Sequence, residues 1–465
     1  MQKHDESPTD GKSTRREFLV RGSRVATGLA VATSLAACAR SKPRLQVRGA
    51  VIGANDRIHM AVIGTRSRGE SLAQSFAKLE NVEVKTLCDV DENLFSERVK
   101  AVEEIQGVAP STAVDLRRVY DDREIDAVAI ATPDHWHALA TIWACQAGKH
   151  VYVEKPCSHN VWEGRKMVEA ARKYECLVAV GFQNRSNTSV QQAMKFLHEG
   201  GIGEVYMARG LCFKPRDSIG RHPDSAVPPG VNYDLWLGPA RRRPFNQNRF
   251  HYEWHWFWDY GCGDIGNQGP HQFDLARWGL NKNEHPVKVA SLGGYYAWDS
   301  DQETPNTQSA LFEYADGKQL AFDTRGLFTN SEDGILIGNL FYGTKGWMRL
   351  DGSTWKTYFG RNNEPGPSSE SAEESADPTN LAGAGGESHF ANFIAAIRSG
   401  KREALTSEIE SGHISTVLPH LANIAYRTGR TLSFDGARER FSGDREANAL
   451  LTRDYREPYV VPEEV

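Results

Sequence analysis

Residues 127–156 read AVAIATPDHWHALATIWACQAGKHVYVEKP, and this stretch decides the fold class. Its first apolar run, residues 127–131, is typical of a buried strand, which Pro133 ends. Apolar residues then recur at helical spacing as far as Gly148, a common helix stop. A second apolar run, residues 151–153, completes a strand–helix–strand unit, which is the usual connection between parallel strands. The stretch therefore predicts an α/β domain built on a parallel sheet.

Polar residues follow both of these strands. Residues 132–137 come directly after the first strand, and residues 154–156 come after the second. Open parallel sheets bind their ligands just beyond the carboxyl ends of the strands. We therefore expect the two polar groups to share one binding site.

A second binding pattern precedes this unit. Residues 58–63 predict a strand, residues 64–69 (GTRSRG) a turn before a helix, and residues 82–88 a strand that ends at Asp89. Glycines in such a turn let the backbone approach a pyrophosphate at the helix N-terminus, and the acidic residue accepts hydrogen bonds from the adenosine ribose. The pattern predicts a Rossmann dinucleotide-binding domain over residues 57–180. Its predicted cofactor-binding residues here are Gly64, Thr65, Arg66, Ser67, Arg68, Gly69 and Asp89.

One position departs from the usual glycine pattern. Arg66 stands where the middle glycine of G-x-G-x-x-G is expected. A contact of Arg66 with a phosphate keeps NADP open as an alternative to NAD. A purely structural turn is the other alternative.

Composition excludes several classes of protein. The 465 residues carry a net charge of −5 without a basic patch, which argues against nucleic-acid binding. The seven cysteines form no Cys-x-x-Cys pair, so a disulfide framework or a structural zinc site is not expected. Histidine pairs occur at 135/137 and 251/255, but no third ligand follows at a telling spacing, and we expect no metal.

The first forty residues are predicted to be a targeting signal. Residues 14–19 (TRREFL) resemble a twin-arginine export signal, and an apolar run, residues 25–37, follows. Residues 35–38 (LAAC) resemble a lipobox, in which Cys38 is lipidated; the alternative is simple signal cleavage beside an incidental cysteine. We expect export by the twin-arginine machinery to the periplasm or cell envelope, with a linker over residues 41–56.

The second half predicts an α+β domain, residues 181–440, with a large, open and mostly antiparallel sheet. Residues 309–314 and 319–324 alternate around a turn and predict a hairpin. Residues 287–296 and 335–350 add further strands. We expect few helices here, chiefly residues 390–400 and 407–428, a flexible loop over residues 362–386 and a polar tail over residues 441–465.

Several motifs together resemble the Gfo/Idh/MocA family of nicotinamide-dependent oxidoreductases. They are Thr132-Pro133-Asp134-x-x-His137, residues 148–151 (GKHV), Glu154-Lys155-Pro156, residues 261–271 (GCGDIGNQGPH) and residues 389–400 (HFANFIAAIRSG). The resemblance implies that Lys155 is catalytic and that Thr132, Pro133, His137, Glu154 and Lys155 line the cofactor. A lysine at a strand end and a histidine at a helix start, neither touching a ligand, are the alternatives.

The second-domain motif departs from the family at one position. The family usually has an aspartate four residues before its histidine, where this chain has Asn267, and Asp264 lies three residues upstream. An asparagine cannot act as a general base, although it can bind a sugar hydroxyl. The resemblance therefore leaves His271 as the acid–base partner of Lys155, against the alternative of a structural histidine.

Aromatic residues gather just before this motif, where residues 250–260 read FHYEWHWFWDY. Aromatic rings suit the apolar faces of sugars, although such side chains equally pack cores and interfaces. The predicted substrate-binding residues are Tyr233, Arg249, His251, Trp254, Asp264, Asn267 and His271.

We therefore predict an exported NAD(P)-dependent oxidoreductase acting on a sugar, a sugar derivative or a polyol. An exported enzyme cannot rely on free cofactor, so NAD, or alternatively NADP, is expected to be tightly bound. A redox-neutral NAD-dependent glycosidase and a non-catalytic dinucleotide- or sugar-binding protein are the alternatives. The open sheet predicts a homo-oligomer, a dimer or a tetramer.

Overall fold

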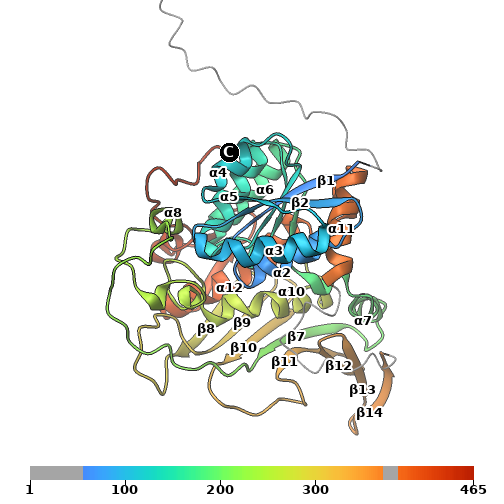
Figure 1. The fold of residues 1–465 in the computed structure, drawn as a ribbon. Helices are drawn as coiled ribbons and strands as arrows, with labels where there is room; N and C mark the ends of the chain where they lie inside the picture. The colour runs from blue at the N-terminus through green and yellow to red at the C-terminus, as the bar shows by residue number, and fades with distance from the viewer. Residues whose placement is uncertain (1–55, 370–385) are drawn as a thin grey trace, which may run out of the picture. The chain divides into compact units, whose positions relative to one another are not determined.

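The computed structural model describes residues 56–369 and 386–465 (Figure 1). The predicted export signal and Cys38 lie outside the described residues, so both alternatives for the N-terminus stay predictions. In the described ranges, no helix is long and apolar enough to cross a membrane.

The first sheet has six parallel strands in the order β3–β2–β1–β4–β5–β6. The central strands are buried on both faces, which explains their nearly continuous apolar sequences. The Rossmann-like sheet predicted from the sequence is thereby confirmed. Its strands are β1 (Ile58–Ile63), β2 (Val82–Cys88), β3 (Ser111–Ala113), β4 (Ala127–Ile130), β5 (His150–Val153) and β6 (Val178–Val180).

Helices cover both faces of this sheet (Figure 1). One face is covered by α2 (Arg68–Ala77), α3 (Phe95–Gln106) and α11 (Gly386–Ser399); the other by α4 (Leu116–Asp121), α5 (Asp134–Gln146) and α6 (Val161–Lys173). Helix α11 returns from far along the chain, and its Phe390 ring lies 5.1 Å from that of Phe76 on α2. The core of the first sheet therefore includes a late segment of the sequence.

The predicted strand–helix–strand unit is β4–α5–β5, and its two strands pair in parallel. Helix α5 is buried over most of its surface, which explains why its apolar residues exceed a single helical face. The loop after β4 and the segment after β5 lie at the same edge of the sheet, as the parallel arrangement requires.

The second sheet has ten strands in the order β14–β13–β12–β11–β7–β10–β9–β8–β15–β16. Strands β7 and β10 pair in parallel, and the remaining pairs are antiparallel. The predicted hairpin is β9–β10, in register from Glu313 and Gln319 onward. The strands are β7 (Val205–Cys212), β8 (Lys288–Gly294), β9 (Thr307–Glu313), β10 (Gln319–Arg325), β11 (Ile337–Gly343), β12 (Gly346–Asp351), β13 (Thr354–Phe359), β14 (Glu364–Ser368), β15 (Leu432–Asp435) and β16 (Arg440–Phe441).

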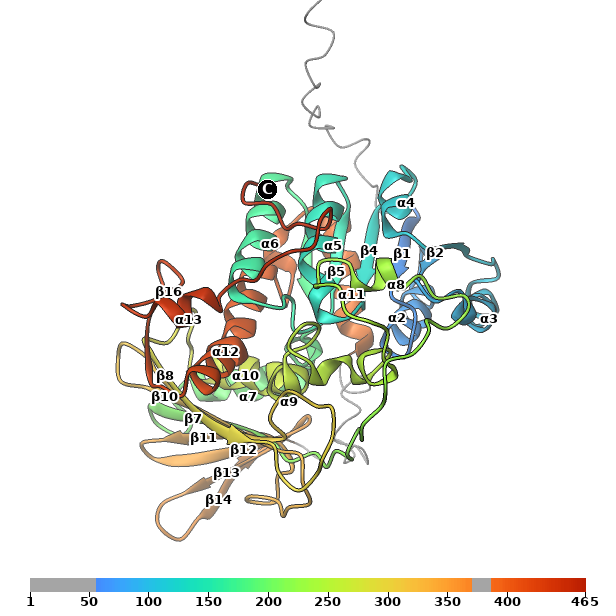
Figure 2. The ribbon, with the colours of Figure 1, turned by 90° about the vertical axis from the view of Figure 1, so that its left-hand side faces the viewer.

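One face of the second sheet packs on α7 (Thr188–His198), α10 (Gly269–Gly279) and α12 (Ile409–Thr428), and Figure 2 shows these helices above it. Side chains alternate between the two faces of a strand, and the other face leaves large apolar residues exposed. They include Tyr206, Leu292 and Leu311.

Two expectations for the second half were wrong. Helices are not few, because α7 and α10 both lie where no helix was predicted. Helix α10 contains Pro270 and begins and ends on glycine, but a proline in the first turn costs no backbone hydrogen bond. The predicted flexible loop begins with strand β14, which pairs with β13, whereas residues 370–385 lie outside the described residues.

The C-terminal residues pack on the first domain despite their polar composition. Residues 445–449 form the short helix α13. Tyr459 and Val461 are buried, and the Tyr459 ring lies 5.5 Å from that of Trp136 on α5. The predicted polar tail therefore closes part of the first sheet's helical layer.

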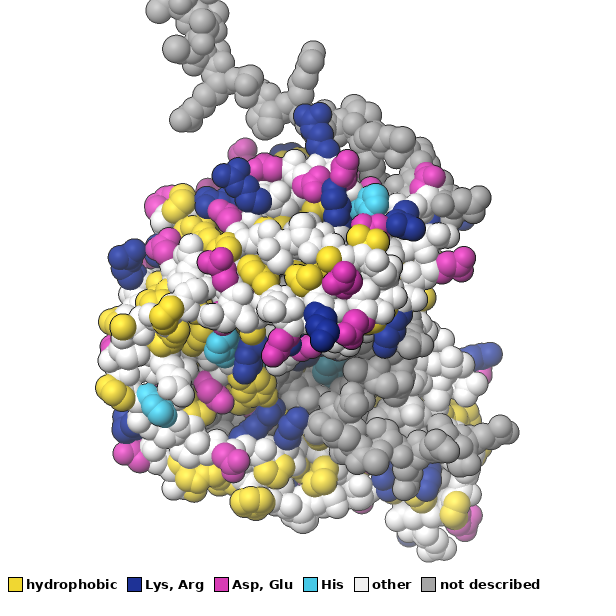
Figure 3. Space-filling model, viewed as in Figure 1, with side chains coloured by type: hydrophobic (Ala, Val, Ile, Leu, Met, Phe, Trp, Pro, Cys, Tyr) yellow, Lys and Arg dark blue, Asp and Glu magenta, His cyan; other side chains and the backbone are white. Residues whose placement is uncertain are grey.

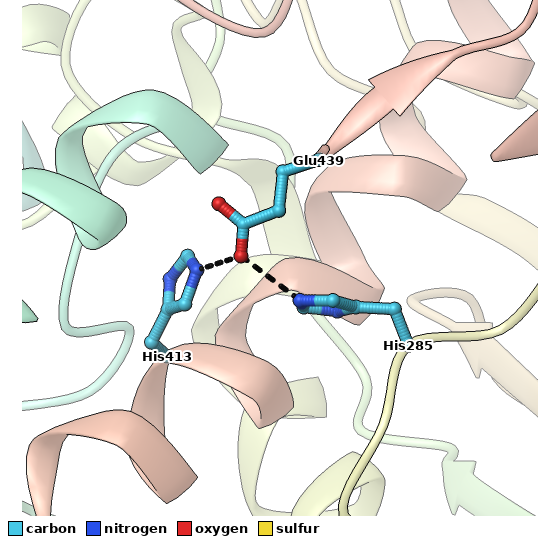
Figure 4. Close-up of side chains that lie close together, drawn as sticks. All are labelled: His285, His413 and Glu439. Carbon is cyan, nitrogen blue, oxygen red and sulfur yellow. Dashed lines mark hydrogen bonds and ion pairs between the residues drawn. The ribbon is translucent and has the colours of Figure 1, made fainter. Parts of the chain in front are cut away.

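A cluster of polar side chains fastens the β15–β16 hairpin to the helices (Figure 4). Glu439 Oε1 lies 3.0 Å from His285 Nε2 and 2.7 Å from His413 Nε2, and Arg165 of α6 donates to both carboxylate oxygens. Burial acts to raise the pKa of Glu439, but these donors outweigh it and hold that pKa well below its usual range. The carboxylate is thus the shared acceptor of three separate segments.

The same cluster is the candidate for a metal site among the described residues. Bonds of about 2.0–2.2 Å to a tetrahedral zinc would bring the ligand atoms to roughly 3.3 Å from one another, whereas Glu439 Oε1 lies 2.7 and 3.0 Å from the two histidine nitrogens, the distances of direct hydrogen bonds. Arg165 also places a positive charge on the carboxylate. We therefore describe the group as a hydrogen-bonded ion-pair cluster, and the absence of a metal stays a prediction.

We expect Glu439→Gln to lower the free energy of unfolding by about 1–2 kcal/mol at neutral pH, because Arg165 keeps only Glu410 as a counter-ion and His285 and His413 lose a charged hydrogen-bond partner. The folded-state pKa of Glu439 lies below the unfolded value of about 4.3, so this stability is present above that pH and fades as the pH falls below it. Urea unfolding over a pH series measures both. Exposed Glu446→Gln is the control; a wild-type advantage that grows as the pH falls below about 4 would contradict the role.

Candidate active site

A cavity of about 510 Å³ opens where β1, β2, β4 and β5 end. Its other walls come from the covering segment, which we define as residues 213–262 between β7 and α9 (Gly263–Asn267), and from the start of α10. The two polar groups predicted to meet at this edge do meet. The predicted site residues that line the cavity are Gly64, Arg66, Ser67, Arg68, Asp89, Thr132, Pro133, His137, Glu154, Lys155, His251, Trp254, Asn267 and His271.

The turn after β1 is packed too closely for side chains at its two glycines. Gly64 has φ +81°, and a Cβ there would lie 2.7 Å from Ala131 O. A Cβ at Gly69 would lie 1.6 Å from Gly64 O. Arg66, in contrast, stands exposed at the cavity, and no side chain caps the start of α2. The open N-terminal turn of α2 is therefore suited to hold a phosphate.

Asp89 is fixed at the end of β2 by three donors. Its Oδ2 accepts from Thr65 N at 2.6 Å and from Thr65 Oγ1 at 3.1 Å, and its Oδ1 accepts from Asp91 N at 3.0 Å. Burial raises the pKa of Asp89 although these hydrogen bonds oppose the rise. Thr65 thus acts by holding Asp89 rather than by lining the cavity.

Glu154 joins the end of β5 to the start of α2. It accepts from Arg68 Nε at 2.7 Å and from Gln183 Nε2 at 3.2 Å. Burial acts to raise the pKa of Glu154, but the charges of Arg68 and Lys155 outweigh it, and the pKa is lowered. The buried carboxylate therefore stays ionised and holds the two edges of the cavity together.

Lys155 follows it at the centre of the cavity wall, before a cis peptide bond to Pro156. Its Nζ donates to Asn267 O at 2.7 Å and lies 3.4 Å from Asn267 Oδ1. Burial lowers the pKa of Lys155, and the carboxylates of Glu154 and Asp134 offset only part of that effect. The amine is consequently easier to deprotonate than a surface lysine.

His271 reaches the cavity from the first turn of α10. It is buried, its ring lies edge-on to Phe182, and its Nδ1 has no hydrogen-bond partner within the described part of the chain. Burial, with the positive charges of Lys155 and Arg68 nearby, holds the pKa of His271 well below its usual value. The ring is therefore neutral near pH 7, the form in which a histidine can act as a base.

His137 braces the edge of the site between two loops. Its Nδ1 lies 2.7 Å from Pro156 O and its Nε2 lies 2.8 Å from Thr132 O. Burial lowers its pKa, and a neutral ring donates to only one of these carbonyls at a time. The histidine thus positions the segment that carries Lys155, besides lining the cavity.

Three predicted substrate residues lie elsewhere. Tyr233 lines a neighbouring cavity, and Arg249 is paired with Asp224 at 2.6 Å in another. Asp264 is buried and accepts from Arg216 at 2.7 Å and from Thr324 at 3.1 Å. All three are engaged in holding the second domain and the covering segment, so their substrate contacts are not supported by the geometry.

Other cavity residues were not predicted from the sequence. Asp134 and His255 belong to motifs that were noted without giving these residues a role, and burial raises the pKa of the first and lowers that of the second to about 3. Asp91, Arg117 and Gln183 carry no motif, and only their position after a strand or a turn could have indicated them.

Two family models match the chain. One, an oxidoreductase family with an NAD-binding Rossmann fold, matches residues 58–182. The other, the C-terminal α/β domain of that family, matches residues 213–339 and 379–461. The chain belongs to the Gfo/Idh/MocA oxidoreductase family. This confirms the resemblance drawn from the motifs.

Curated relatives match over parts of their length. A glycosyl hydrolase family 109 protein of Shewanella pealeana is 30% identical over 35% of this chain and 38% of the relative. A levoglucosan dehydrogenase of Pseudarthrobacter phenanthrenivorans is 38% identical over 21% of this chain and 25% of the relative. The chain thus spans less than half the length of these relatives.

Solved structures share the fold over most of the chain. The WlbA dehydrogenase of Chromobactrium violaceum, in complex with NADH and UDP-GlcNAcA, aligns with a TM-score of 0.60 and 22% identity, covering 82% of this chain and 97% of that one. A levoglucosan dehydrogenase in complex with NADH aligns with a TM-score of 0.62 and 18% identity, covering 81% and 99%.

The cavity of this chain fits the dinucleotide that the family binds. Its glycine turn leaves backbone open toward a phosphate, no side chain caps the start of α2, and Asp89 lies at the end of β2, where a carboxylate could bind a ribose. No metal-ligand cluster of the described residues lies at this cavity, since the one such group is the Glu439 cluster.

We expect Gly69→Ala to abolish dinucleotide binding, because the added methyl group would overlap Gly64 O and displace α2 from the sheet. Binding is measured by the quenching of protein fluorescence on titration with NADH. Gly107→Ala is the matched control, since its Cβ meets nothing within 4 Å and costs only backbone strain of about 1 kcal/mol. Equal loss of binding in both variants would argue against the close approach as the cause.

Proposed function

We propose that the protein is an exported NAD-dependent oxidoreductase that acts on a sugar, a sugar derivative or a polyol. The observation that carries this proposal is that Lys155 and His271 line the same cavity as the glycine turn and Asp89. Lys155 is suited to bind a substrate oxygen, and His271 is suited to accept a proton. Both therefore lie in the same cavity as the residues expected to bind the cofactor.

The choice of NAD over NADP follows from the charges around the ribose position. Asp89 and Asp91 both line the cavity there, and a 2′-phosphate would face two carboxylates. Arg66 favours NADP and stands on the open side of the turn, whereas Arg117, also at the cavity, is paired with Asp115 at 2.6 Å. Two negative charges against one exposed positive charge favour NAD.

The catalytic roles divide between the two basic side chains. NAD, when bound, accepts the hydrogen and the electron pair of the substrate's C–H bond. The Lys155 ammonium donates a hydrogen bond to the substrate oxygen, and the neutral His271 ring accepts the hydroxyl proton. Asn267 positions Lys155 through its backbone oxygen, so the amide at this position does not remove the lysine from the site.

A carbohydrate fits the aromatic wall of the cavity. Trp254 and His255 stack with ring centroids 3.6 Å apart, and Tyr252 lies beside them. Such rings cover the apolar face of a sugar, while polar neighbours bind its hydroxyls. On the face shown in Figure 3, Lys and Arg side chains lie among Asp and Glu, which fits a small-molecule substrate better than a nucleic acid.

A redox-neutral glycosidase is the second candidate. Oxidation at one ring carbon acidifies its neighbour, and the neutral His271 ring could then remove that proton before elimination of the leaving group. The name of a curated relative, glycosyl hydrolase family 109 protein, points the same way. Release of a leaving group without net reduction of NAD, with solvent deuterium entering the sugar, would identify this reaction.

A non-catalytic binding protein is the third candidate, and the placement of Lys155 and His271 at one cavity speaks against it. Export by the twin-arginine route, with or without a lipid anchor at Cys38, rests on the sequence of residues 14–38. A homo-oligomer rests on the exposed apolar face of the second sheet, where Leu292 is 79% exposed.

The proposal is tested by purifying the protein without added nucleotide, denaturing it and analysing the supernatant by mass spectrometry. We expect NAD or NADH in about a one-to-one ratio to protein, because an exported enzyme must retain its cofactor. Release of NADP would overturn the cofactor choice. If nothing is released and neither nucleotide binds afterwards, the oxidoreductase proposal is wrong.

We expect Lys155→Met to lower kcat/KM for sugar oxidation by about 10²- to 10⁴-fold while NADH still binds, since the methionine keeps the volume and removes the donor. The measurement is stopped-flow absorbance of the nicotinamide together with an NADH titration. Lys195→Met on α7, where the lysine side chain is 73% exposed, is the control. Full activity of Lys155→Met with the best sugar found would exclude the lysine from catalysis.

We expect kcat/KM for oxidation to fall on the acid side of a pH profile, with the midpoint well below pH 6.5. The His271 pKa lies below its ordinary value, and the ring works as a base only above that pKa. His271→Asn should lose activity and this acid limb together. An unchanged acid limb in the residual activity of His271→Asn would assign the proton to another group.

A further inference from the structure

Two contacts between the covering segment and the nucleotide-binding domain lie beside the cavity. At the first, the start of α5, His135 Nε2 lies 2.9 Å from Trp236 O, and Trp136 Nε1 donates to Leu235 O at 3.0 Å. Trp236 also belongs to an apolar cluster within the covering segment, so this anchor is buried. It holds one side of the segment firmly against the domain.

The second contact lies in the loop after β2, next to Asp89, where the ribose of the dinucleotide is expected. Glu92 N donates to Gly230 O at 2.9 Å, and Asn232 N donates to Val90 O at 2.8 Å, which forms an antiparallel bridge between residue 91 and residue 231. Asn93 Nδ2 adds a bond of 2.9 Å to Pro229 O. These bonds join residues 90–93, in the loop after β2, to residues 229–232 of the covering segment, and we call this contact the buckle.

Asp91 connects this buckle to the cavity. Its backbone N–H donates to Asp89 Oδ1 at 3.0 Å, its Oδ1 accepts from Asn93 N at 3.1 Å, and its Oδ2 lies 3.3 Å from His251 Nε2. Asp91 is buried. It lines the cavity together with Asp89 and His251. Asp91 thus contacts Asp89, the Asn93 side of the buckle and His251 of the covering segment.

We propose that Asp91 is a positioning residue that fastens the covering segment over the bound dinucleotide and slows its release. The inference rests on the proposed function, in which a dinucleotide occupies this cavity. Because residues on both sides of the buckle line that cavity, opening the buckle would widen the way out for a bound nucleotide. An exported enzyme that keeps its cofactor needs such a restraint.

The size of the effect follows from the bonds involved. A typical hydrogen bond contributes about 1 kcal/mol, which corresponds to roughly fivefold in a rate of opening. Loss of the Asn93 bond to Pro229 O should therefore speed release by about fivefold, and loss of the carboxylate charge beside His251 should change release in the same direction. The buried anchor at α5 would still hold the segment, so folding and the first steps of NADH binding remain.

The test uses the full-length holoenzyme and measures the NADH release rate by fluorescence after a chase with excess NAD. Asp91→Asn keeps an acceptor for Asn93 N while removing the charge that faces His251, and Asn93→Ala removes the bond to Pro229 O. Asp121→Asn, at the exposed end of α4, is the charge-matched control. We expect release about fivefold faster in Asn93→Ala, faster than wild type in Asp91→Asn, and unchanged in the control.

A double variant, Asp91→Asn with His251→Asn, separates positioning from simple destabilisation. Since both changes remove one contact, release from the double variant should be no faster than from the faster single variant. If Asp91→Asn, Asn93→Ala and wild type release NADH at equal rates, the positioning role of Asp91 is wrong, while the proposed function stands. A wild-type protein that binds no NADH would overturn the proposed function as well.

Discussion

The close approach of the turn after β1 to the end of β4 is the constraint on which the site depends. A Cβ at Gly64 would lie 2.7 Å from Ala131 O, and a Cβ at Gly69 would lie 1.6 Å from Gly64 O. Because no side chain fits, α2 begins directly against the sheet, and its first turn faces the cavity. The same closeness lets Thr65 reach Asp89 and lets Arg68 reach Glu154, so one backbone contact fixes both carboxylates of the cofactor edge.

The groups around Lys155 explain how a buried amine is held by a hydrogen bond rather than by an ion pair with a carboxylate. Glu154 is shared with Arg68, and Asp134 is buried with its Oδ2 unpartnered within the described structure. The amine itself donates to a backbone oxygen, that of Asn267. A backbone acceptor does not depend on which side chain occupies position 267, so an asparagine there leaves the lysine in place while it removes a negative charge. Burial then lowers the pKa of Lys155.

Local patterns predicted the parts of this protein that depend on local geometry. The parallel strands, the glycine turn, Asp89 and the segment 154–156 follow from neighbouring residues, because strand ends and turns fix where such side chains point. What depends on distant segments was missed. Helix α11 was predicted as a helix but not as part of the first core, α10 lies within a motif that indicated a site rather than a helix, and Arg249 pairs with Asp224.

The aromatic residues between positions 250 and 260 both form a core and line the cavity. Composition alone could not tell which residues do which. Trp256, Phe257 and Tyr260 are buried in the core of the covering segment, Tyr252 and His255 line the cavity, and Trp254 does both. A core of its own lets the segment hold its shape with only limited contacts to the nucleotide-binding domain. Substitutions on its cavity side can therefore change the fit to a substrate while the sheet and the glycine turn, which bind the cofactor, keep their packing.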